Sequence, residues 1–96
     1  SDRRVESLVI EGSFAFLNHR HADEIRELLV EEQPQTIAVV AAQLPPSVSA
    51  SVLAGLSPDR QADVLQRVAR LGPTDPEILD VIAAELKERL GLDPDF

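Results

Sequence analysis

The strongest pattern of hydrophobic positions along this chain lies in residues 34–44. Between Gln35 and Gln43 every residue except Thr36 is apolar, so a helix here has no solvent-facing side and must be surrounded by other elements. Many of these residues are β-branched, which leaves a buried strand as the competing interpretation. The length of about ten residues, the alanines, and Pro34 at the first position favour a helix. We therefore predict a central helix over residues 34–44.

Two apolar patterns precede the central helix. The first has apolar residues three and four positions apart, as on one helix face, and predicts a short helix over roughly residues 2–10. Its apolar residues are Val5, Leu8 and Val9. After a break at Gly12, the second pattern brings Phe14, Phe16 and Leu17 close together. Aromatic side chains bury large areas, so we expect this group to attach the lead-in segment to the core.

A further helix is predicted over residues 22–31. Asp23 and Glu24 fall in its first turn, where the helix dipole favours negative charge. Its core residues, at helical spacing, are Ile25, Leu28 and Leu29. His21 occupies the N-cap position and is a poor capping residue, so we expect this helix start to be weak.

Proline marks the start of the three remaining helices, which we predict over residues 46–55, 58–70 and 76–90. Proline suits the first helical position because the N–H that it lacks has no partner there. Ser57 and Asp75 precede two of these prolines as good N-caps, and Gly91 is a good C-terminal stop.

The apolar residues of these three helices define the faces that we expect to point inward. They are Val48, Val52 and Leu53, then Val64, Leu65 and Val68, and finally Ile78, Leu79, Val81, Ile82, Leu86 and Leu90. On the solvent side of the last helix, Glu85 and Arg89 are spaced for an ion pair.

Short helices joined by short, proline-containing turns predict the fold class. Helices of this kind stack side by side, so we expect an all-α, armadillo-like right-handed array of about five to six short helices. The domain should span residues 14–91, after an N-terminal linker or helix over residues 1–13 and before a frayed tail over residues 92–96. Arrays of this type present ridges and grooves that suit protein binding.

Composition limits the possible partners. The 96 residues carry a formal net charge of −8, which argues against binding to nucleic acid or to anionic membrane surfaces. No run of apolar residues approaches the ~18 that a membrane-spanning helix needs, so we expect no membrane insertion. The absence of cysteine excludes disulfides, thiolate metal sites and cysteine nucleophiles.

Candidate catalytic or metal-binding chemistry is sparse. His19 and His21 have no third ligand nearby and are more simply solvated residues at a helix start. Adjacent helical carboxylates, as in Glu31-Glu32, point in different directions and do not form an acid/base pair. There is no phosphate-binding loop and no H-E-x-x-H motif. We therefore expect no catalytic residue, no metal site and no cofactor, and an enzyme is disfavoured.

Several segments resemble the middle domain of the flagellar motor switch protein FliG. Glu32-Gln33-Pro34-Gln35 is similar to the Glu-His-Pro-Gln motif of that family, and an apolar helix and a Leu-Pro-Pro turn follow it in both. Four flanking segments are similar as well: Phe14-Ala15-Phe16-Leu17, Leu56-Ser57-Pro58, Val64-Leu65-Gln66-Arg67-Val68-Ala69 and Asp75-Pro76-Glu77-Ile78-Leu79. The resemblance covers about residues 14–90 with essentially no gaps.

The resemblance implies a function and a set of site residues. In the family this armadillo-like domain binds the switch protein FliM and stacks on a neighbouring FliG in the ring at the cytoplasmic face of the membrane. Carried over by position, the partner-binding residues are Glu32, Gln33, Pro34, Gln35 and Arg67. Gln33 departs from the family's histidine: it keeps a donor and an acceptor but loses the titratable ring. These 96 residues contain neither the family's ring-mounting domain nor its torque domain. The resemblance therefore implies that the chain is either one part of such a protein or a FliG-like chain with another role.

The residues themselves agree with a binding surface. A helix that starts at Pro34 presents free N–H groups, and we expect Glu32 and Gln35 to lie beside them at one exposed end. The guanidinium of Arg67 is expected to pair with Glu32 or with a carboxylate of the partner. In the plainer alternative, Glu32 and Arg67 only form a salt bridge within the domain.

Two further expectations follow. The N-terminal helical domain of MgtE magnesium transporters has similar Leu-Pro-Pro-punctuated helices, so a regulatory domain whose acidic surface binds Mg²⁺ is the alternative function. A unit taken from a stack should also leave an apolar surface uncovered. We expect that surface around Ile78, Ile82 and Leu86, or around Val5, Leu8 and Val9.

Overall fold

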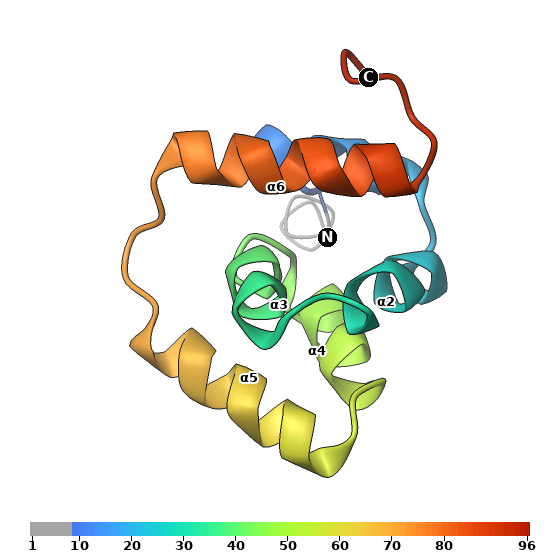
Figure 1. Cartoon of the computed structure of the whole chain (residues 1–96). Helices are drawn as coiled ribbons and strands as arrows, with labels where there is room; N and C mark the ends of the chain where they lie inside the picture. Colours follow the sequence, from blue (N-terminus) through green and yellow to red (C-terminus); the bar gives the residue numbers. More distant parts are fainter. Residues whose placement is uncertain (1–8) are drawn as a thin grey trace, which may run out of the picture.

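The computed structural model describes residues 9–96 and consists of helices joined by short turns (Figure 1). The elements are η1 (Gly12–His19), α2 (Ala22–Val30), α3 (Pro34–Ala41), α4 (Pro46–Ala54), α5 (Pro58–Arg70) and α6 (Pro76–Arg89). Within residues 9–96 there is no strand, and the predicted all-α, armadillo-like fold is confirmed. The helix expected over residues 2–10 lies mostly outside the described residues, and Val9 and Ile10 belong to no helix.

Helix α3 is the centre of the domain, as its sequence predicts. All five residues from Ile37 to Ala41 are buried, and α4, α5 and α6 each pack against this helix. Figure 1 shows α3 enclosed by the other helices. The helical interpretation of this segment is therefore confirmed, although the helix ends at Ala41 rather than at Leu44.

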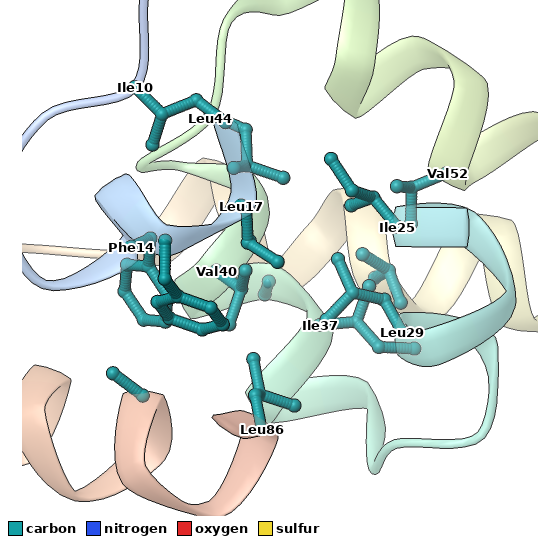
Figure 2. Close-up of a cluster of buried hydrophobic side chains, with 14 of the residues drawn as sticks. Ile10, Phe14, Leu17, Ile25, Leu29, Ile37, Val40, Leu44, Val52 and Leu86 are labelled. Atoms are coloured by element: carbon teal, nitrogen blue, oxygen red, sulfur yellow. The ribbon is translucent and has the colours of Figure 1, made fainter. Parts of the chain in front are cut away.

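The lead-in segment forms an element that the apolar pattern did not reveal. Residues Gly12–His19 form a 3-10 helix that packs against α6, and its Phe14, Phe16 and Leu17 are buried. Figure 2 shows Phe14 and Leu17 in a cluster with Val40 of α3 and Leu86 of α6. The expectation that this group attaches the segment to the core is confirmed.

Local signals set the helix ends much as the sequence predicts. Pro34, Pro46, Pro58 and Pro76 each begin a helix. The Asp75 carboxylate accepts the Glu77 backbone N–H at 2.8 Å and caps α6. At the other end of α6, Gly91 has a φ of +72°, and the Leu92 N–H donates to the Lys87 carbonyl at 2.9 Å. This is a Schellman motif, which favours glycine because of the left-handed conformation.

Three residues predicted to point inward are instead exposed. Leu65, Ile78 and Val81 have exposed fractions of 48%, 53% and 69%. The reason is the one-sided packing of the outer helices: in the described residues α6 packs mainly against η1 and α3, and α5 mainly against α3. The buried side of α6 is therefore narrower than its apolar pattern, and Ala83 and Leu86 lie at its centre.

The limits of the domain at residues 14 and 91, and the fraying of residues 92–96, stay predictions. The tail does contact the helices. The Lys87 ammonium donates to the Pro94 carbonyl at 3.3 Å, and the ring centroids of Phe96 and His19 lie 5.3 Å apart in an edge-to-face arrangement.

Candidate partner-binding surface

The turn between α2 and α3 positions the first residues of the candidate surface. Gln33 occupies the N-cap position of α3 with an extended backbone (φ −64°, ψ 149°), and its side chain makes no capping hydrogen bond. Gln33 and Gln35 are exposed on either side of the half-buried Pro34. Proline holds the backbone at a helical φ at this point. The two glutamine side chains therefore project from a rigid helix start.

Arg67 joins this surface from α5. Its Nη1 donates to Gln35 Oε1 at 3.1 Å, and its Nε donates to Asp63 Oδ1 at 2.8 Å. Asp63 lies one turn before Arg67 on the same helix, so the guanidinium is held from two sides. Arg67 itself remains exposed. The structure thus brings together Gln35 and Arg67, which the sequence separates by many residues.

A polar cleft of about 540 Å³ opens beside this contact. Its walls include Gln35, Asp63, Gln66, Arg67 and Arg70, and it ends at the turn after α5. The cleft therefore combines two amide groups, two guanidinium groups and the carboxylate of Asp63.

Glu32 does not belong to the exposed surface, contrary to the prediction. Its side chain is only 7% exposed and forms an ion pair with the Arg89 guanidinium at the end of α6. Glu32 also holds its turn through the backbone: Arg60 donates to the carbonyls of Val30 at 2.7 Å and Glu32 at 3.0 Å. Glu32 therefore fixes the turn that carries Gln33 and Pro34, with partners on α5 and α6.

The Glu85–Arg89 ion pair expected from the sequence does not form. Of the two alternatives for Arg67, the pair with Glu32 is wrong, and the pair with a carboxylate of the partner stays a prediction. Arg67 pairs with Asp63 and not with Glu32, and Arg89 pairs with Glu32 and not with Glu85. The Glu32 carboxylate faces α6, whereas Arg67 lies beside the first turn of α3. Local spacing could have suggested the Asp63–Arg67 pair, but no local signal identifies Arg60 or Arg89 as partners of the turn.

The weak N-cap at His21 is compensated within α2. The Glu24 carboxylate accepts the His21 backbone N–H at 3.3 Å and lies 3.3 Å from the Arg20 guanidinium. These contacts, the backbone hydrogen bond foremost, hold the pKa of Glu24 below its usual value. Helix α2 therefore begins with half of a capping box.

Metal-binding groups are scattered in this structure. In the part of the chain that the structure describes, no three His, Asp or Glu side chains come together as a metal site. His19 packs against Phe96, and His21 occupies the N-cap position of α2.

Comparison with known proteins agrees with this architecture. The fold is that of an armadillo-like helical domain, and the family description "FliG middle domain" matches residues 22–93. The chain belongs to the FliG middle-domain family. Helix by helix, the match runs from α2 to the turn after α6.

Several curated relatives are similar along most of the chain. The flagellar motor switch protein FliG of Thermotoga maritima is 35% identical over 89 residues, which is 93% of this chain and 26% of that protein. FliG of Bacillus subtilis is 31% identical over 80% of this chain and 23% of its own length. The chain thus spans about a quarter of the length of these relatives. No solved structure matches it significantly.

None of the helices between residues 9 and 96 is long and apolar enough to cross a membrane.

Proposed function

We propose that this chain is a non-enzymatic interaction module of the flagellar motor switch that binds a FliM-like switch protein. The binding surface consists of Gln33, Pro34, Gln35 and Arg67. Glu32, the first residue of the motif, acts from behind this surface by fixing the turn. Family membership supports the motor role, and the geometry of the surface supports the assignment of residues.

The contact between Gln35 and Arg67 is the observation that carries this proposal. A guanidinium held by Gln35 and Asp63 has lost much of its rotational freedom before a partner arrives. It still has N–H groups that no residue between 9 and 96 uses, because two hydrogen bonds occupy only part of its donors. A preorganised, exposed arginine beside two amides suits recognition of backbone carbonyls or a carboxylate on a partner.

Gln33 defines one property of the proposed interaction. Its amide can donate and accept, as the family's histidine can, but it does not titrate near neutral pH. Binding through this surface should therefore be insensitive to pH between about 6 and 8, where an unperturbed histidine would change charge.

Stacking between neighbouring FliG-like subunits is the second part of the proposal. The outer flank of α6, formed by Ile78 and Val81, is apolar and exposed. An exposed apolar surface on a helical array suits contact with another helical unit. In this account the domain lies at the cytoplasmic face of the membrane, within the flagellar basal body, because both partners are components of that assembly.

Calorimetry tests the proposal. A FliM-like switch protein encoded in the same genome is titrated into the chain, and a saturable heat is expected. A parallel titration with millimolar Mg²⁺ examines the alternative of an MgtE-like regulatory domain, for which saturable Mg²⁺ binding is expected. Mg²⁺ binding without binding of the switch protein would overturn the proposal.

A further inference from the structure

Arg70 is distinctive among the positively charged residues of the described region. The chain has nine Lys and Arg residues, and all except Arg3 and Arg4 lie within residues 9–96. Six of these seven form a contact through their charged groups: Arg20, Arg26, Arg67 and Arg89 form ion pairs, Arg60 binds two carbonyls, and Lys87 binds the Pro94 carbonyl. Among these described cations, Arg70 alone has neither an ion pair nor a hydrogen bond.

The position of Arg70 makes its lack of an ion pair or hydrogen bond informative. Acidic residues outnumber basic ones by 17 to 9 in this chain, so an arginine without an ion pair is unexpected. A favourable interaction with the dipole at the end of α5 explains a basic residue there. It does not explain why the side chain lines the polar cleft beside Gln35 and Arg67.

An apolar groove continues the polar cleft. The groove has a volume of about 530 Å³ and lies between α3, the connection over residues 71–75, and the first turns of α6. Figure 1 shows this connection spanning the distance between α5 and α6. The groove and the cleft share Gln35, Leu71 and Gly72 as walls, so they form one continuous surface.

The walls of the groove are mostly aliphatic. Val39 of α3 forms one side, Ile78 and Ile82 of α6 form the other, and Pro73 lies in the connection. Asp75 also borders the groove, but its carboxylate is occupied as the N-cap of α6. A side chain that enters the groove would therefore meet hydrocarbon, with a free guanidinium close by.

We propose that the groove and Arg70 bind a segment of a partner protein in which a carboxylate lies next to one or two aliphatic side chains. The aliphatic groups occupy the groove, and the carboxylate pairs with Arg70 and the available N–H groups of Arg67. The inference rests on the proposed function in one respect: the surface is continuous with the one assigned to the switch protein. The unpaired guanidinium of Arg70 selects a carboxylate as the occupant, because on this surface Asp63 already pairs with Arg67 and Asp75 caps α6.

Charge and groove variants test the inference in the complex with the FliM-like switch protein. Arg70→Glu should weaken binding at least about tenfold, because it replaces attraction with like-charge repulsion at the interface. It should also reduce the dependence of Kd on salt. Arg26→Glu makes the same charge change on α2 and should leave Kd within about twofold, as expected for a charge remote from the interface.

A matched pair of exposed apolar residues tests the groove. Ile78→Ser removes an aliphatic wall and should weaken binding, whereas Leu65→Ser, on α5 and outside both the cleft and the groove, should not. Both residues are exposed, so neither change should unfold the domain. If Gln35→Ala weakens binding of the switch protein but Arg70→Glu and Ile78→Ser do not, this inference is overturned while the proposed function stands.

A peptide titration keeps the test independent of the switch protein. The probes are a blocked pentapeptide of two Asp and three Leu residues and a twin in which Asn replaces Asp. In NMR spectra, the acidic peptide should shift the Arg70 Nε–H and the methyl groups of Ile78 and Ile82, and the twin should shift the Arg70 signal much less. If the switch protein does not bind, these shifts alone support the inference, and their absence overturns it.

Sedimentation in which Ile78→Ser abolishes a dimer, together with no peptide shifts, would assign the groove to a second copy and also overturn it.

Discussion

Arg89, in the last turn of α6, forms an ion pair with Glu32 in the turn between α2 and α3. The Glu32 side chain is 7% exposed and that of Arg89 39% exposed, so the carboxylate is the buried member of the pair. This contact connects the C-terminal helix to the turn that precedes the proposed binding surface. Glu32 therefore acts within the domain, whereas Gln33 and Gln35 face solvent.

Arg89→Ala should destabilise the domain, because it leaves a buried carboxylate without its partner. Removal of one member of a fully buried ion pair costs about 3–5 kcal/mol, and the partial exposure of Arg89 reduces this to about 1–3 kcal/mol. Urea unfolding followed by circular dichroism measures the change. Glu88→Ala, exposed in the same turn, is the control and should change the midpoint little. Equal midpoints for Arg89→Ala and the parent would show that the pair does not stabilise the fold.

Val40→Asp should unfold the domain. Val40 is fully buried in α3, and an unpaired charge at such a position costs several kcal/mol. That cost is comparable to the whole stability of a small domain, about 5–15 kcal/mol. Ala50→Asp, exposed on α4, is the control and should melt near the parent temperature. A normal melting curve for Val40→Asp would contradict the central position of α3.

The start of α2 should weaken in acid. The folded pKa of Glu24 lies below its usual value of 4.5 because the His21 backbone N–H and the Arg20 side chain favour the carboxylate. A lowered folded pKa means that this stabilisation is complete above about 4.5 and is lost as the pH falls through the folded pKa. The protection factors of the amides at residues 22–26, which correct the exchange rates for their intrinsic dependence on pH, should therefore fall in acid. Glu24→Gln should remove this pH dependence and Glu27→Gln should keep it; identical acid profiles for both variants would exclude the assigned role of Glu24.

The outer flank of α6 should mediate weak self-association. Ile78 and Val81 are exposed, whereas Leu86, which the sequence also placed in an uncovered surface, is fully buried. We expect concentration-dependent dimerisation that Val81→Ser reduces and Ala84→Ser leaves unchanged. Sedimentation equilibrium measures this directly. A strictly monomeric parent up to millimolar concentration would count against the stacking proposal.

The sequence predicts those features that local chemistry determines. Proline at the first helical position and the caps Ser57 and Asp75 set helix starts within one or two residues, since their effects are confined to a single turn. The continuous apolar pattern of α3 predicts its central position, because a helix without a polar side must be enclosed.

Features that depend on tertiary packing were predicted poorly. The partner of Glu32 is Arg89, far along the chain, and no sequence spacing selects it over Arg67. Ile78, Val81 and Leu86 are all apolar, but Leu86 alone of the three is buried. The one-sided packing of α6 decides this, and the sequence pattern does not. The contact of Gln35 with Arg67 was expected as a common surface because of the family resemblance, and not because of the residue pattern.

Calorimetric titration of the FliM-like switch protein into the parent, Gln35→Ala and Arg67→Ala chains tests the central claim most directly. Polar side chains at the centre of an interface cost about 2 kcal/mol or more when truncated, so each variant should bind at least about thirtyfold more weakly. Both residues are exposed, so melting temperatures should stay close to that of the parent, and Gln43→Ala, exposed beyond the other end of α3, should bind normally. Parent-like affinity in both Gln35→Ala and Arg67→Ala would contradict the account, because the contact between these residues would then serve the fold alone.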